Sequence, residues 1–259
     1  MRCLSSLLLA GLWAGLCLAT AGCGDEDSQT PVERKRLKSK SADTRAEAAR
    51  RLAQSGQMNE DTTRDLADVA RTDQDRKVRI QAVVALGEAA RRYQHAREAL
   101  ISTLDDSDAM VRNRARQAIA KLGPEAKAAL PKLVDGLAAE DADGQWWTLT
   151  ALGGLGAESA QAVPDLYRLL GSTDPRVRSR AAWALGKIGP PAKFAIARLT
   201  TALEDGDGAV RAEAAAALGH MGPLAAGSVA ALRKLLNNDP IPSIRLEAEA
   251  ALKQIQKTP

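Results

Sequence analysis

The sequence predicts an all-α protein, an α-solenoid of about seven stacked helical hairpins. One motif recurs every 33 or 34 residues from about residue 43 to the C-terminus. Each copy contains two apolar series with helical spacing, and helix-capping and helix-ending residues stand at fixed places between them. Such regular copying is typical of repeat proteins, in which each unit buries its apolar face only by stacking on its neighbours.

The best-defined element of each copy is a helix that begins near a valine. Counted from that valine, small or apolar residues stand at positions 0, +4, +7, +8 and +11, which share one face of a helix. The fifth copy shows this pattern in Val177, Ala181, Ala184, Leu185 and Ile188. The valine positions align at Thr44, Val78, Val111, Gly144, Val177, Val210 and Ile244.

The two ends of this helix are marked by an aspartate and a glycine. Aspartate three residues before the valine is a good N-cap, because its carboxylate accepts backbone N–H groups of the first turn. Glycine at +12 is expected to end the helix in a left-handed conformation. The N-cap residues include Asp75, Asp108, Asp174 and Asp207, and the glycines are Gly56, Gly123, Gly156, Gly189 and Gly222.

The second element of each copy is an amphipathic helix upstream of the aspartate. It is indicated by pairs of leucines four residues apart, such as Leu166 and Leu170, which fall on one helical face. A hairpin of two such helices cannot bury both apolar faces alone, so the units are expected to stack into one continuous core. In the first copy, Arg51 and Ser55 replace apolar residues, as is typical of a terminal cap.

The motif D-x-x-V-R-x-x-A-x-x-A-L-G-x-x-G resembles the HEAT-like repeats first described in phycobilisome lyases, and the resemblance covers residues 43 to 256. Neither the ankyrin nor the tetratricopeptide motif is in register. The resemblance implies that the second helix of each hairpin lines a concave surface. The sequence departs from the motif at Gly144 and Gln145 in the fourth copy, and at Asp239 and Pro242 in the last.

Residues 1–22 are predicted to be a lipoprotein signal peptide. A basic start precedes an apolar stretch from Leu4 to Leu18, and the stretch is too short and too rich in glycine and alanine to favour a permanent membrane span. The ending Ala21-Gly22-Cys23 resembles a bacterial lipobox, which implies cleavage before Cys23 and its lipidation. The alternative is an ordinary secretory signal. We therefore expect a protein of the bacterial cell envelope, anchored to the membrane by lipid, with its repeats exported.

Residues 23–42 are predicted to be the lipidated cysteine and a flexible polar linker, followed by the solenoid over residues 43–259. The basic run from Arg34 to Lys40 in this linker is interpreted as solvated, with contact to anionic headgroups as the alternative. Loss of the signal removes one basic residue from a formal net charge of +4, and the remaining charge is too small to favour nucleic acid as a partner.

The sequence offers little material for catalysis. It contains two histidines, His95 and His220, which lack metal-ligand spacing to cysteines or carboxylates. Phosphate-binding, dinucleotide-binding and nucleophile-elbow motifs are absent from it. We therefore expect a protein that is not an enzyme and that needs no metal and no cofactor.

Arginine follows the valine position in most copies and stands near the N-cap aspartates of its own or the adjacent unit. We interpret this repetition as a ladder of ion pairs that sets the register of stacking, because exposed pairs contribute only about 0–1 kcal/mol each. The ladder residues are Arg79, Arg112, Arg178, Arg211 and Arg245 with Asp75, Asp108, Asp174 and Asp207.

All three tryptophans outside the signal peptide fall on the solvent face of the valine helices, in the fourth and fifth copies. Tryptophan and arginine are the residues most often found at binding hot spots. The hypothesis is a partner-binding surface, and the alternative is packing of the indoles onto neighbouring helices. The surface comprises Trp146, Trp147, Trp183, Arg114, Lys121, Arg180 and Lys187.

These observations favour a membrane-tethered, monomeric scaffold or adaptor that binds another protein through its central repeats. One alternative is recognition of an anionic envelope polymer or glycan by the same tryptophan-rich, basic surface. A second alternative follows the name of the repeat family, and is an accessory subunit of a protein-modifying, bilin-lyase-like enzyme.

Overall fold

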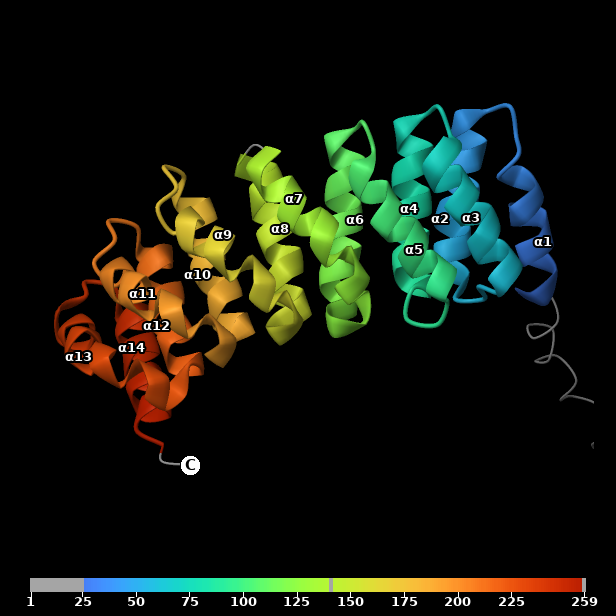
Figure 1. Cartoon of the computed structure of the whole chain (residues 1–259). Coiled ribbons are helices and arrows are strands. Elements are labelled where there is room, and N and C mark those ends of the chain that lie inside the picture. The colour runs from blue at the N-terminus through green and yellow to red at the C-terminus, as the bar shows by residue number, and fades with distance from the viewer. Residues whose placement is uncertain (1–25, 140–141, 258–259) are drawn as a thin grey trace, which may run out of the picture.

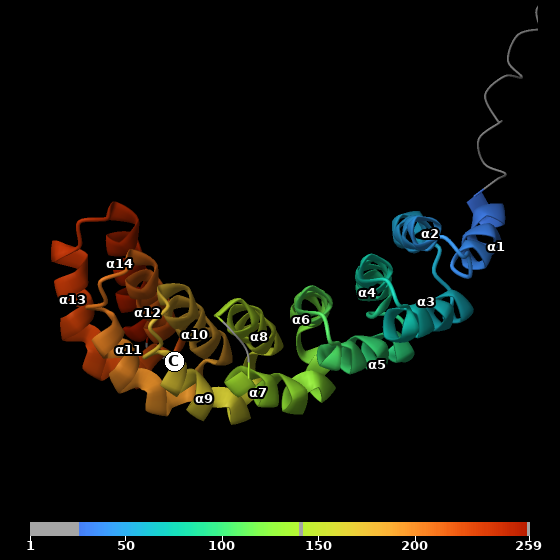
Figure 2. The same ribbon diagram turned by 90° about the horizontal axis from the view of Figure 1, so that it is seen from above.

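The computed structural model describes residues 26–139 and 142–257, and every regular element within them is a helix. The helices form two rows that follow one another along an arc, as Figures 1 and 2 show. The row on the inner, concave side of the arc in Figure 2 contains the valine helices. The predicted all-α solenoid is therefore confirmed, and the second helix of each hairpin lines the concave side as the resemblance implies.

The inner row consists of α2 (Ala42–Ser55), α4 (Arg76–Ala89), α6 (Ala109–Leu122), α8 (Ala142–Leu155), α10 (Pro175–Ile188), α12 (Gly208–His220) and α14 (Pro242–Ile255). The outer row consists of α1 (Glu26–Arg36), α3 (Glu60–Thr72), α5 (Gln94–Ser102), α7 (Leu130–Ala139), α9 (Val163–Leu169), α11 (Ile196–Ala202) and α13 (Val229–Asn238). Short 3₁₀ segments accompany the outer helices: η1 (Thr103–Asp105), η2 (Gly123–Ala129), η3 (Gly156–Ala162), η4 (Pro190–Ala195) and η5 (Gly222–Ser228).

The inner helices begin and end where the motif predicts. Asp174 accepts a hydrogen bond from the Arg176 backbone N–H at the start of α10, and Asp75, Asp108 and Asp207 cap their helices in the same way. At the other end the +12 glycines have positive φ, between 58° and 71°, a region that L side chains rarely adopt. The N-cap aspartates and the +12 glycines therefore fix where the inner helices begin and end in each repeat.

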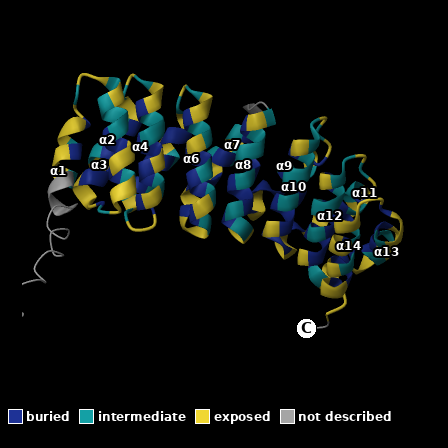
Figure 3. Cartoon of the chain, turned by 180° about the vertical axis from the view of Figure 1, so that it is seen from behind, coloured by how far each residue is buried: buried dark blue, intermediate teal, exposed yellow. Residues whose placement is uncertain are grey.

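The core runs between the two rows. In α10 all five motif residues from Val177 to Ile188 are buried, and Leu166 and Leu199 of the outer row are fully buried beside them. Successive inner helices pack against one another along the whole stack, and Figure 3 shows buried residues in every hairpin. A chain beginning at residue 24 keeps every described helix, because all of these contacts lie within residues 26–257.

The first hairpin corrects one expectation. Residues 26–36, which the sequence analysis placed in a flexible linker, form α1, the outer helix that packs against α2. Leu37 is buried beneath it, and Glu33 is buried where the next outer helix has Leu66. The Glu33 carboxylate meets the Arg51 guanidinium at 3.3 Å, at the point where later units place alanine. Helix α1 therefore lacks the apolar pattern of the other outer helices, because an ion pair stands where later units have a leucine and an alanine.

Helix α8 of the fourth hairpin lies very close to α6 of the third at Gly154. A Cβ atom added to Gly154 of α8 would lie 2.5 Å from the Ala120 carbonyl oxygen and 2.9 Å from the Ala120 Cα of α6. Both are backbone atoms, so the contact cannot be relieved by a side-chain movement. Gly154 therefore permits the spacing between α6 and α8.

Candidate functional site

A repeated feature of the stack is a ladder of arginine–aspartate pairs along the turns that precede the inner helices. The Arg178 guanidinium of α10 donates through Nε and Nη2 to both carboxylate oxygens of Asp205 in the next unit, at 2.8 and 2.7 Å. Its Nη1 donates to the carbonyl oxygens of Ser172 and Thr173 in its own turn. Each such arginine therefore ties its own turn to the turn of the following unit.

The acidic partner differs from the one expected. It stands two residues before the N-cap, and the N-cap aspartate is occupied with the helix N-terminus, as Asp207 is at the Ala209 and Val210 N–H groups. Direct pairing of the ladder arginines with the N-cap aspartates is therefore wrong, although Asp207 still acts on Arg178 through space. The observed pairs are Arg45–Asp73, Arg79–Asp106, Arg178–Asp205 and Arg211–Asp239.

The ladder is varied where the motif is irregular. Gln145 replaces the arginine of the fourth unit and donates to the Leu137 carbonyl oxygen, and Ser172 stands where other units have the accepting aspartate. Arg112 and Arg245 likewise donate to carbonyl oxygens of their own turns. Asp239, which departs from the motif in the sequence of the last unit, is the regular ladder acceptor of that unit.

The guanidinium groups also change the acidity of their partners. A hydrogen bond from Arg211 holds the pKa of the Asp239 carboxyl below its ordinary value, and Arg178 acts in the same way on the pKa of Asp205. Bidentate pairs of this kind are geometrically specific. The ladder therefore has a structural role in fixing register.

The tryptophans of α8 and α10 form a cluster around one arginine. The Arg180 guanidinium carbon lies 4.3 Å from the centre of the Trp146 ring and 4.8 Å from the centre of the Trp183 ring. Trp147 meets Trp146 edge to face, with ring centres 4.7 Å apart. Guanidinium groups over indole faces are attracted by the ring quadrupole. The structure therefore brings together four residues that the sequence analysis had only placed on the same surface.

These side chains are half-buried, so both sequence interpretations describe part of the arrangement. Trp183 packs partly on the core, and its ring lies over Gly153 of α8, where an added Cβ would come within 2.1 Å of it. The remaining ring surface is open to solvent. Gly153 was not singled out from the sequence, because its role depends on a tryptophan 30 residues later in the next unit.

The cluster has a charged border on α10 and α12. The Lys187 ammonium lies 5.8 Å from the Trp183 ring centre. Burial lowers the pKa of the Arg180 guanidinium, which nearby Glu213 partly offsets. Burial raises the pKa of the Glu213 carboxyl, and Arg180 acts against this rise. His220 lies close enough to Lys187 for both burial and that charge to lower its pKa.

Two predicted members of the surface lie apart from the cluster. Arg114 and Lys121 are exposed on α6, the inner helix next to α8, and Arg114 donates to the Gln117 side chain of its own helix. They form a basic border on the other side of the tryptophans. The predicted lipidation site, Cys23, and the predicted signal peptide lie outside the described residues.

Residues 26–139 and 142–257 contain no group of three or more histidine, cysteine, aspartate or glutamate side chains arranged to hold a metal. They also have no helix with the length and apolar character needed to cross a bilayer.

Comparison with solved structures agrees with this architecture. An engineered protein is 27% identical over 89% of this chain and 69% of its own, with a TM-score of 0.60. The complex of CpcE and CpcF of phycocyanin lyase from Nostoc sp. PCC7120 matches at 23% identity over 87% of this chain and 94% of that chain, with a TM-score of 0.55. An archaeal HEAT-like repeats protein from Thermococcus onnurineus NA1 matches at 17% identity over 87% and 96%, with a TM-score of 0.60.

Comparison with curated proteins gives no match. The family described as HEAT repeats matches residues 63–143, 130–200 and 192–253, which together span most of the solenoid. The chain therefore belongs to the HEAT repeat family.

Proposed function

We propose that the protein is a membrane-tethered HEAT-repeat scaffold, without catalysis of its own, that binds another protein through the concave surface of its fourth and fifth hairpins. The observation that supports this most is the cluster of Trp146, Trp147, Trp183 and Arg180. It gathers all the tryptophans outside the signal peptide onto one half-buried surface. Large aromatic rings held in place by neighbours are the usual anchors of protein interfaces.

The Arg180 side chain strengthens this proposal. Its guanidinium carbon lies over both the Trp146 and Trp183 rings, and its N–H groups donate no hydrogen bond to another residue of the described part of the chain. A half-buried cation with donors to spare is a good partner for a carboxylate or carbonyl group of a bound chain. The ring contacts hold the side chain in place before binding, which lowers the entropy lost on association.

Replacing Trp146, Trp147 and Trp183 together with alanine is expected to weaken partner binding by at least about 30-fold, because hot-spot aromatics contribute about 2 kcal/mol or more each. Protein beginning at residue 24 is used to capture partners from envelope extract, and the affinity of an identified partner is then measured for parent and variant. Phe194→Ala is the matched control, because Phe194 is a 53% exposed aromatic of the η4 segment. Equal affinity of the parent and the triple variant would contradict the proposal.

The proposed tether has a consequence for geometry. Helix α1 begins at Glu26, three residues after Cys23. Three residues span at most about 11 Å, so an anchor at Cys23 would hold the first hairpin beside the bilayer. A lipoprotein anchor is stable because several acyl chains insert together, each contributing about 0.8 kcal/mol per buried methylene.

Replacing Cys23 with alanine is expected to move the protein from the membrane fraction to the soluble fraction. The measurement is fractionation of cells followed by detection of the repeat domain in each fraction. Ser28→Ala, a neighbouring change that leaves the cysteine intact, serves as the control. Retention of the Cys23 variant on the membrane would show that the lipid-anchor assignment is wrong.

The second candidate ligand is an anionic polymer or glycan, favoured by the basic borders of the cluster. Arg114 and Lys121 lie on α6, on one side of the tryptophans. Arg180 lies over the Trp146 ring and Lys187 beside the Trp183 ring. Binding driven by these charges should weaken strongly with salt, because the Debye length falls from about 10 Å at 0.1 M to about 3 Å at 1 M. Binding through the indoles should tolerate the same change.

A further inference from the structure

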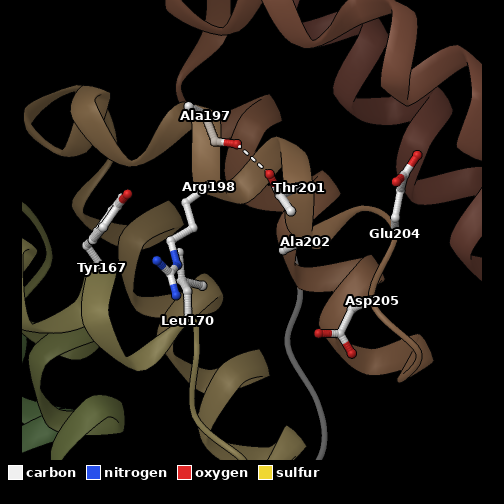
Figure 4. A pocket seen from close by; sticks show the side chains of 8 residues that line it. All are labelled: Tyr167, Leu170, Ala197, Arg198, Thr201, Ala202, Glu204 and Asp205. Carbon is white, nitrogen blue, oxygen red and sulfur yellow. Dashed lines mark hydrogen bonds between the residues drawn. The ribbon is translucent and has the colours of Figure 1, made fainter.

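A separate pocket lies on the convex side of the arc, between the outer helices α9 and α11 (Figure 4). Its volume is about 610 Å³, which is within the range of small-molecule sites. Leu170, Ala197 and Ala202 provide apolar walls, and Tyr167 and Arg198 stand on one side. Neither the tryptophan cluster nor the proposed tether involves this pocket.

Comparison with the unit two repeats earlier shows that the basic residue of this pocket has lost the acidic partner found there. In that earlier unit, Lys132 forms an ion pair with Asp105, which lies 27 residues before it. The residue equivalent to Lys132, two repeats of 33 residues later, is Arg198, and the residue equivalent to Asp105 is Gly171. The basic residue is thus present in this unit, and a glycine occupies the position of its acidic partner.

The geometry places Arg198 at that position. A Cβ added to Gly171 would lie 2.3 Å from an Arg198 guanidinium nitrogen, so the guanidinium fills the space that an aspartate side chain would need. The guanidinium carbon lies 5.0 Å from the Tyr167 ring centre, and the Tyr167 ring in turn lies 5.5 Å from that of Phe194. This stacking orients the guanidinium at the pocket wall.

The acidic groups nearest to the pocket are already paired. Glu204 accepts from the Lys234 ammonium at 2.7 Å, and Asp205 accepts both bonds from Arg178. No ion pair of Arg198 with a described carboxylate lies within 4.0 Å. The unpaired charge of the pocket is therefore positive, and it borders an apolar wall.

We propose that this pocket binds a small organic carboxylate, whose charged group pairs with the Arg198 guanidinium from the pocket side and whose apolar body packs on Leu170 and Ala202. The guanidinium presents paired N–H donors with the spacing of a carboxylate. The volume and the apolar wall favour an organic anion over a bare inorganic one. The assignment is independent of the partner-binding surface, which lies on the other row of helices.

Benzoate is the probe, and binding is followed by backbone amide shifts of Leu170, Gly171 and Thr201 in protein that begins at residue 24. Benzoate is expected to change these chemical shifts in a saturable way. Neutral benzamide and inorganic phosphate at the same concentration are expected to cause changes at least tenfold smaller. Arg198→Ala is expected to weaken benzoate binding at least tenfold. Absence of saturable shifts with benzoate, or an equal response to phosphate, would overturn the proposal.

Two further variants separate this role from a structural one. Gly171→Asp introduces the acid that Asp105 provides two repeats earlier, and the only side chain in its way is the movable end of Arg198. It should abolish benzoate binding while raising the melting temperature by about 1–3 °C through the new pair. Arg168→Ala removes an arginine of the neighbouring helix α9 that is paired with Asp165, and it should leave benzoate binding unchanged. Benzoate binding that persists in Gly171→Asp or Arg198→Ala would exclude the proposed site.

Discussion

Replacing Asp239 with alanine is expected to destabilise the C-terminal hairpin by about 3 kcal/mol. Its side chain is 2% exposed and accepts from Arg211, whose side chain is 12% exposed, at 2.7 Å. It also accepts the Ile241 backbone N–H at the start of α14. The variant leaves a largely buried guanidinium without its carboxylate, so α13 and α14 should lose hydrogen-exchange protection before the rest of the stack.

The loss of stability in the Asp239→Ala variant should become smaller as the pH falls. Because Arg211 holds the pKa of Asp239 below the ordinary value of about 3.9, the unfolded chain takes up this proton at a higher pH than the folded one. The stabilisation is therefore present above the unfolded pKa and is lost as the pH falls through the folded pKa. The difference in unfolding free energy between parent and variant should narrow as the pH is lowered from about 7 to about 3.

Glu204→Ala is the matched control, because it removes a ladder-independent pair. Glu204 and Lys234 are 66% and 68% exposed, so solvent screens their attraction and the pair should contribute little to stability. Equal losses of stability in the two variants would mean that the ladder contributes no more than ordinary surface pairs.

Replacing Gly154 with alanine is expected to destabilise the centre of the solenoid by about 3 kcal/mol, despite the gain of about 1 kcal/mol in helix propensity. The added methyl carbon would stand 2.5 Å from the Ala120 carbonyl oxygen, so α6 and α8 must move apart. Chemical denaturation should then show a lower midpoint, or a separate transition for the hairpins on either side.

Gly227→Ala provides the comparison for this second variant. Nothing lies within 4 Å of a Cβ added at Gly227, so its effect should stay within about 0.5 kcal/mol. A Gly154 variant as stable as the Gly227 variant would show that the two inner helices separate without loss of packing.

Much of the candidate surface could be predicted, because helical spacing alone places Trp146, Trp147 and Trp183 away from the core. The contact between Arg180 and Trp146 could not, because the two residues lie 34 positions apart on neighbouring inner helices. Their meeting depends on how far one hairpin shifts and turns relative to the next. The separate positions of Arg114 and Lys121 depend on the same relation.

The sequence pattern also could not show which aspartate of each turn pairs with the ladder arginine. Both aspartates of the turn, such as Asp205 and Asp207, recur in several units at constant spacing. The backbone of the turn assigns one to the helix N-terminus and directs the other toward the preceding unit. The spacing was visible, whereas the direction of each carboxylate was not.

By itself, the sequence determined the all-α class, the hairpin, its period, its N-caps and its terminating glycines, because these depend on residues within one or two helical turns of each other. The tertiary structure decided the partners of the ladder, the recruitment of α1 into the first hairpin, the Arg180 cluster and the pocket at Arg198. Each of these joins residues from neighbouring elements or repeat units. Their contacts depend on the stacking of whole hairpins, a long-range property that local periodicity does not specify.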